Sequence, residues 1–186
     1  IDSNIGYAGL AKYKAEMEKD NFVVLVDAGD AIQGDTIGTV SKGEYLVDIM
    51  NEVGYDFCVL GNHEFDYGTD VLASLLKKAD AQYLNATIEY TGNGNNLLKD
   101  TVPYVIERFG FLDVAFIGVS TPESITKSTP RYFMEDGQFV YDFAAGEDLY
   151  AAVQGYVDEV REKGADVVVV ISHLGVEEGS EPNRAT

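Results

Sequence analysis

The stretch FVVLVDAGD, residues 22–30, is the part of the sequence that decides the fold. Its first five residues, Phe22 to Val26, are an unbroken apolar run of strand length, which is typical of a strand buried on both faces of a parallel sheet. Polar residues follow at once and end in Asp30. The stretches DFCVLGNHEFDYG, residues 56–68, and DVVVVISH, residues 166–173, repeat the order of apolar run and polar exit. The sequence therefore predicts several buried strands that end in polar side chains.

Segments with helical periodicity lie between these runs. Residues 44–52 carry apolar side chains on one helical face, and Gly54 ends that pattern. Strands that alternate with helices of this length predict βαβ units and a largely parallel sheet. The expected helices are residues 7–17, 44–52, 70–79 and 149–160, and the expected strands are residues 22–26, 56–60, 82–85 and 166–171.

Three other segments depart from this alternation. Residues 102–109 and 113–119 are apolar runs separated by a short turn, which predicts an antiparallel hairpin added to the sheet and therefore a mixed sheet. Residues 90–100 contain glycines and asparagines without a hydrophobic period, so we expect a surface excursion. Residues 120–145 have the composition of a loop.

The composition is that of a folded protein, because 46% of the residues are apolar and 24% are charged. Its 186 residues correspond to one domain or to most of a larger one. The 32 acidic and 13 basic residues give a net charge of −19, which repels a polyphosphate backbone and excludes nonspecific nucleic-acid binding. No apolar run approaches the roughly 20 residues that a membrane span needs. The single cysteine, Cys58, does not identify a redox compartment.

Candidate chemical groups follow three of the predicted strands. Asp30 follows the first, Asn62 and His63 follow the second, and His173 follows the last; the chain has no other histidine. Functional groups in open α/β sheets gather at the carboxyl ends of strands, and carboxylates, amides and imidazoles are ligands for divalent metals. Each residue alone has an ordinary structural explanation, such as a cap, a turn or a hydrogen bond to a loop carbonyl. Their occurrence together favours a metal site.

These motifs resemble a known family. Gly29-Asp30, the run Gly61 to Glu64, and His173 are similar to three motif blocks of the calcineurin-like metallophosphoesterases. Residues 27–34 and 61–68 resemble most closely the bacterial 5′-nucleotidases and 2′,3′-cyclic phosphodiesterases. The resemblance implies a four-layer αββα metallophosphoesterase fold with mixed sheets.

The resemblance also implies roles for individual residues and two divalent metal ions, whether Mn, Zn, Mg, Co or Fe. Asp30 matches the carboxylate that bridges the two ions, and Asn62 and His173 match ligands of the second ion. His63 matches the residue that faces the scissile phosphate without binding metal, and Asp66 orients and charges it. Glu64 and Gly68 are expected to shape the loop rather than contact substrate.

Two family motifs are not found in these 186 residues: an Asp-x-His block expected upstream and a Gly-His-x-His block expected downstream. The C-terminal nucleotide-binding domain of 5′-nucleotidases is not found either. We therefore expect residues 1–186 to be a partial catalytic domain, incomplete at both ends and inactive by itself.

For the full-length parent, the resemblance implies metal-dependent hydrolysis of nucleotide phosphate monoesters, small-molecule substrates, and an extracytoplasmic location. One alternative is a cyclic-nucleotide or nucleotide-sugar phosphodiesterase with the same metal core. The other is a noncatalytic α/β binding module that retains the loop sequences.

Overall fold

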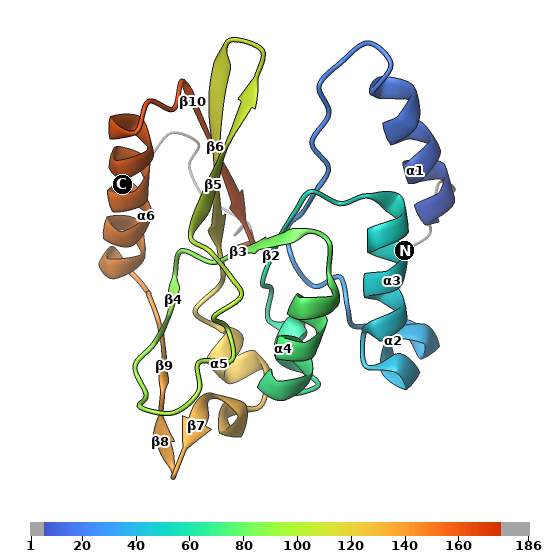
Figure 1. Cartoon of the computed structure of the whole chain (residues 1–186). Helices are drawn as coiled ribbons and strands as arrows, with labels where there is room; N and C mark the ends of the chain where they lie inside the picture. The colour runs from blue at the N-terminus through green and yellow to red at the C-terminus, as the bar shows by residue number, and fades with distance from the viewer. Residues whose placement is uncertain (1–5, 176–186) are drawn as a thin grey trace.

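The computed structural model describes residues 6–175. Two three-stranded sheets lie at its centre, and helices flank them on both sides (Figure 1). The first sheet is parallel and has the order β1-β2-β3, while the second is mixed, with β10 parallel and β5 antiparallel to β6. The strands are β1 (Val26–Asp27), β2 (Phe57–Val59), β3 (Gln82–Leu84), β5 (Tyr104–Phe109), β6 (Leu112–Val119) and β10 (Val167–Ser172).

Four longer helices occupy the positions that the sequence predicts. They are α1 (Gly6–Met17), α3 (Glu44–Val53), α4 (Thr69–Lys78) and α6 (Glu147–Glu162). α3 begins after Gly43 and ends at Gly54, both in the left-handed conformation, and the amide of Gly54 caps the last turn. A shorter helix, α2 (Asp35–Ser41), precedes α3. Among the described residues no helix is long and apolar enough to cross a membrane.

Side-chain alternation along the strands produces four layers. On β2, Cys58 packs with Met50 of α3 and Leu72 of α4, so these helices cover one face of the first sheet. Phe57 and Val59 point the other way and pack against the second sheet.

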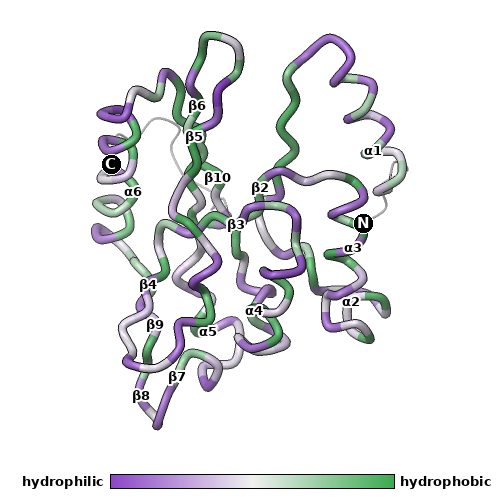
Figure 2. The backbone as a smooth tube through the Cα atoms, in the orientation of Figure 1, coloured by the Kyte–Doolittle hydropathy of each residue, from purple (hydrophilic) through white to green (hydrophobic). Residues whose placement is uncertain are grey.

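The second sheet is divided in the same manner. Phe116 and Ile171 face the first sheet, whereas Ala115 and Ile117 pack against Val160 of α6. Figure 2 shows the corresponding hydrophobic colour along β2, β5, β6 and β10. The order of helix, sheet, sheet and helix confirms the predicted αββα architecture, in which the second central sheet is mixed and the first is parallel.

The two sheets approach each other closely at a glycine. A Cβ atom on Gly118 of β6 would lie 2.4 Å from the Leu84 Cβ and 2.5 Å from the Leu84 carbonyl oxygen of β3. The Ala86 amide also donates to the Gly118 carbonyl at 2.8 Å. Any side chain at position 118 would therefore push the sheets apart.

We expect Gly118→Ala to lower the free energy of unfolding by roughly 1–3 kcal/mol, because an added methyl group overpacks this contact. Urea titration measures the change. Gly155→Ala in α6 is the matched control, because nothing lies within 4 Å of the added Cβ. That control should stabilise by about 0.5–1 kcal/mol, since alanine favours helix. A Gly118→Ala variant as stable as the wild type would contradict the close approach.

The first predicted strand is shorter than expected and is not buried on both faces. Only Val26 and Asp27 form β1, and Phe22 is 73% exposed with its ring edge against Phe109. β1 pairs with β2 alone among the described strands. An apolar run forms a strand buried on both faces only where neighbouring strands and layers cover it. Residues 22–25 lack that cover.

Two further expectations are corrected. The predicted hairpin exists as β5 and β6, but it belongs to the second sheet rather than extending the first. Residues 120–145 are not simply a loop, because they contain short elements, one of which pairs with β4 (Ile88–Tyr90) in a further sheet. These elements are α5 (Ser124–Lys127), η2 (Pro130–Phe133), β7 (Met134–Glu135), β8 (Gln138–Phe139) and β9 (Tyr141–Phe143).

The expected surface excursion at residues 90–100 is also partly wrong. Leu98 is only 4% exposed and joins the core with Tyr141 and the fully buried Phe133. Glycines and asparagines in the segment report its turns, but they do not report the apolar contact that one leucine makes with distant elements.

Candidate metal centre

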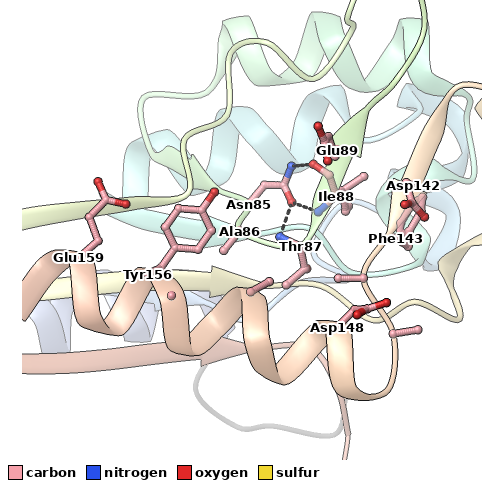
Figure 3. Close-up of a pocket in the computed structure, with 14 residues that line it drawn as sticks. Asn85, Ala86, Thr87, Ile88, Glu89, Asp142, Phe143, Asp148, Tyr156 and Glu159 are labelled. Atoms are coloured by element: carbon pink, nitrogen blue, oxygen red, sulfur yellow. Dashed lines mark hydrogen bonds between the residues drawn. The ribbon is translucent and has the colours of Figure 1, made fainter.

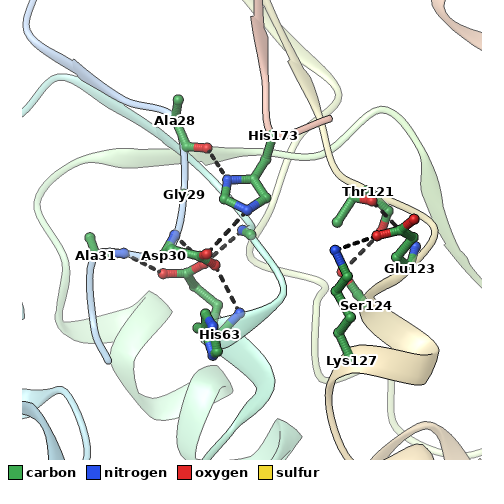
Figure 4. A network of polar contacts seen from close by, with 12 residues as sticks. Ala28, Gly29, Asp30, Ala31, His63, Thr121, Glu123, Ser124, Lys127 and His173 are labelled. Atoms are coloured by element: carbon green, nitrogen blue, oxygen red, sulfur yellow. Dashed lines mark hydrogen bonds and ion pairs between the residues drawn. The ribbon is translucent and has the colours of Figure 1, made fainter. Parts of the chain in front are cut away.

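The carboxyl ends of two strands from different sheets bring Asp30 and His173 together. The Asp30 Oδ2 atom lies 3.2 Å from the His173 Nε2 atom (Figure 4). The His173 Nδ1 atom lies 2.7 Å from the Ala28 carbonyl oxygen, which can only accept a hydrogen bond. The proton of a neutral His173 is therefore on Nδ1, and the lone pair of Nε2 is available on the side of Asp30.

The loop after β2 lies directly against Asp30. The His63 amide donates to the Asp30 Oδ1 atom at 2.9 Å, so one carboxylate oxygen is occupied while the other faces His173. This proximity requires glycine in both loops. A Cβ on Gly29 would lie 2.6 Å from the Gly61 nitrogen, and a Cβ on Gly61 would lie 2.2 Å from Asp30 Oδ1.

A buried glutamate joins the same two loops. Glu64 is 1% exposed, and its carboxylate accepts hydrogen bonds from the backbone amides of Asp30, Ala31 and Gly61 at 2.6 to 2.8 Å. Burial raises the pKa of Glu64 to about 7, while the amide donors act in the opposite direction. The expectation that Glu64 shapes the loop agrees with these contacts, although the sequence did not identify its partners.

His63 and Asp66 form a hydrogen-bonded pair beside Asp30. The His63 Nδ1 atom lies 2.6 Å from the Asp66 Oδ2 atom, across one turn of the short helix η1 (His63–Phe65). This hydrogen bond raises the pKa of the His63 imidazole above its ordinary value. The His63 side chain is 42% exposed, so a bound molecule can reach it.

Gly68 ends this loop in a conformation that favours glycine. Its φ angle is +93°, and an added Cβ would lie 3.3 Å from the ring of Tyr132. The hydroxyl of the next residue, Thr69, donates to the Tyr132 carbonyl at 3.2 Å. The η2 segment therefore supports the loop that carries Asp66.

Asp27 is a second carboxylate near the predicted ligands that the sequence did not single out. Its Oδ2 atom accepts a hydrogen bond from the Gly29 amide at 2.9 Å, and burial raises its pKa. Asp27 and Asp30 lie in the same polar segment after the first predicted strand, so the sequence pattern also contains Asp27. The hydrogen bond from the Gly29 amide, however, makes Asp27 part of the turn.

Asp30, Asn62 and His173 can contribute ligands to a divalent metal site. The acidic and imidazole side chains alone do not complete such a site. Within residues 6–175 no group of three or more His, Cys, Asp or Glu side chains could hold a metal ion. Asp30 Oδ2 and His173 Nε2 converge, and the largely buried Asn62 immediately precedes the residue whose amide binds Asp30. A carboxylate, an imidazole and an amide oxygen are suitable ligands for such an ion.

A separate cavity of about 920 Å³ lies between β4, β9 and α6 (Figure 3). Its lining includes Asn85, Thr87, Glu89, Asp142 and Tyr156, and none of the predicted site residues. The Asn85 side chain accepts from the Thr87 and Ile88 amides and donates to the Ile88 carbonyl, so it shapes the local backbone. The cavity is therefore distinct from the strand-end cluster.

Known proteins share the fold of this chain. Residues 21–186 match the family described as bacterial capsule synthesis protein PGA_cap. The chain belongs to the PGA_cap family. The structure of the calcineurin-like phosphoesterase YfkN from Bacillus subtilis matches this PGA_cap chain with a TM-score of 0.75 and 26% identity, covering 97% of the chain and 57% of that structure. The resemblance to calcineurin-like phosphoesterases and the predicted fold class are confirmed.

Two relatives of the chain are named for their activities. A snake venom 5′-nucleotidase from Gloydius brevicauda is 31% identical over 175 residues, which cover 91% of the chain and 28% of the relative. A 2′,3′-cyclic-nucleotide 2′-phosphodiesterase/3′-nucleotidase from Haemophilus influenzae is 30% identical over 169 residues, which cover 82% of the chain and 24% of the relative. The chain thus spans less than a third of each relative, and its relatives are hydrolases of nucleotide phosphoesters.

Proposed function

We propose that the whole protein containing this chain is a metal-dependent phosphoesterase that hydrolyses nucleotide phosphate monoesters. The observation that carries the proposal is the meeting of Asp30 and His173 from two sheets, with the hydrogen-bonded His63–Asp66 pair beside them. The relatives named 5′-nucleotidase support the substrate class. The family description names capsule synthesis, but it specifies no reaction.

Asp30, Asn62 and His173 would hold divalent metal. When bound, such ions offset the charge of a phosphate group and lower the pKa of a water nucleophile. The Ala28 carbonyl orients the His173 ring, and the His63 amide holds one Asp30 oxygen, so both ligands are preorganised.

His63 would act on the phosphate ester rather than on the metal. Asp66 keeps the imidazole oriented and favours its charged form, in which Nε2 carries a proton. An imidazolium near the scissile bond can stabilise developing negative charge or protonate the leaving oxygen.

Other substrates of the same chemistry are alternatives. A relative named for both a 2′,3′-cyclic phosphodiesterase and a 3′-nucleotidase activity favours a cyclic phosphodiester as the second candidate. An extracytoplasmic location is also a proposal, which the snake venom relative supports because venom is a secretion.

Phosphate release by the purified whole protein tests the proposal. We expect Mn²⁺-dependent hydrolysis of a nucleoside 5′-monophosphate, abolished by EDTA and restored by added metal. A 2′,3′-cyclic nucleotide and a nucleotide sugar are assayed in parallel by chromatography of the products, because hydrolysis of neither bond releases free phosphate. Preferred hydrolysis of either would replace the proposed substrate class, and hydrolysis of none would favour a noncatalytic binding module.

A further inference from the structure

We propose that Glu64 is a positioning residue that holds Asp30 in the conformation that presents one carboxylate oxygen towards His173. The role of Asp30 as a metal ligand is taken from the proposed function. Glu64 itself would touch neither metal nor substrate. Its action would be through the backbone of the loop after β1.

The Glu64 carboxylate binds two consecutive amides of that loop. Its Oε2 atom accepts from the Asp30 amide at 2.8 Å, and its Oε1 atom accepts from the Ala31 amide at 2.8 Å. Successive backbone N–H groups that point at one anion form a concave binding site, and here the anion is a side chain of the protein itself. A third bond, from the Gly61 amide to Oε2 at 2.6 Å, ties the loop after β2 to the same carboxylate.

This contact holds an unusual backbone. Asp30 has a φ angle of 68°, in the left-handed region that residues with a side chain seldom adopt. Rotation of Asp30 about φ to an ordinary negative value would change the direction of its side chain relative to its own amide, which Glu64 binds. The Glu64 carboxylate therefore favours the one backbone conformation in which Asp30 reaches both of its partners.

The two loops hold each other reciprocally (Figure 4). The Glu64 side chain binds the Asp30 backbone, and the neighbouring His63 backbone binds Asp30 Oδ1 at 2.9 Å. Asp30 Oδ2 is left facing His173 Nε2. Both the direction of the Asp30 side chain and the choice of its free oxygen are thus fixed by residues 63 and 64.

A role in simple core packing does not account for this carboxylate. Glu64 is 1% exposed, and no ion pair to it is found among the described residues. A buried carboxylate without a cation is costly unless several donors bind it. All three donors come from the two loops that surround Asp30, so the carboxylate's contacts are concentrated at the candidate site.

Three substitutions separate the effect of side-chain length from the effect of side-chain charge. Glu64→Gln keeps the length but replaces one acceptor oxygen by an NH₂ group, Glu64→Asp keeps the charge but withdraws it by one methylene, and Glu64→Ala removes both. Mn²⁺ affinity of the whole protein is measured by electron paramagnetic resonance, and thermal unfolding is followed in parallel. Glu135→Gln is the charge-matched control; its carboxylate accepts a bond from Tyr90, outside the site.

We expect all three variants to bind Mn²⁺ about 10–100-fold more weakly, as for other residues that orient metal ligands. The loss should increase from Gln to Asp to Ala, because the glutamine retains most of the amide contacts. The control should match the wild type. If charge alone matters, the aspartate variant will bind normally while the glutamine and alanine variants lose affinity equally, which would overturn the proposal.

Amide hydrogen exchange at Asp30, Ala31 and Gly61 in metal-free protein provides a second measurement. Glu64→Gln should accelerate exchange most at Ala31, whose amide would face the NH₂ group in place of Oε1, while the unfolding temperature stays near that of the wild type. Unchanged exchange, or a uniform increase across the protein, would also overturn the proposal. A wild-type protein that has these protected amides but hydrolyses no nucleotide would refute the proposed function and leave the role of Glu64 standing.

Discussion

Asp30→Asn in the whole protein should eliminate divalent-metal binding and nucleotide hydrolysis together. The asparagine oxygen would take the place of Oδ1, because the His63 amide donates to that atom. An NH₂ group would then face His173 in place of Oδ2, and an amide nitrogen does not bind a metal ion in this form. The substitution thus converts the free ligand atom into a donor.

We expect kcat/KM to fall at least about 10³-fold, since metal ions supply several kcal/mol of charge stabilisation and each 1.4 kcal/mol is about tenfold. Elemental analysis of the purified variant and phosphate release measure the two losses. Asp20→Asn, in the exposed turn after α1, is the control and should change neither. Full metal content with normal turnover in Asp30→Asn would show that Asp30 only caps its loop.

The elements of this fold were predictable where local pattern and burial agree. Residues 57–60 are apolar, and β2 lies within them with every residue buried, because α3 and α4 cover one face and the second sheet covers the other. Residues 22–26 have the same pattern but lack such coverage, so the same reasoning failed there. Apolar runs report the capacity for burial, and the neighbours decide whether burial occurs.

The division into two sheets was not visible in the pattern of the strands. Ala115, Phe116 and Ile117 are all apolar, although Phe116 faces the other sheet and its neighbours face α6. A strand that is covered on both faces has the same apolar sequence pattern whichever sheet it joins. Only the resemblance to a known family indicated four layers.

The candidate site was predictable in its members but not in its supporting contacts. Strand ends placed Asp30, His63 and His173 near one another, since functional side chains gather at such ends. The Glu64 contacts join residues 33 and 34 positions apart, and no local spacing encodes them. Strand β9 was missed for the same reason, because its partner β4 is distant in sequence.

His63→Asn and Asp66→Asn should have the opposite signature to Asp30→Asn: metal content near normal with slow turnover. The His63 backbone amide that binds Asp30 is retained in His63→Asn, so the ligand geometry should persist. Loss of a general acid costs roughly 10²–10⁴-fold in kcat. Asp66→Asn should lower kcat less, because Asp66 acts through the imidazole, which lies 2.6 Å away and remains in place.

Steady-state kinetics with elemental analysis decide the assignment. Loss of metal in His63→Asn would make His63 a ligand, and a larger defect in Asp66→Asn than in His63→Asn would separate the pair.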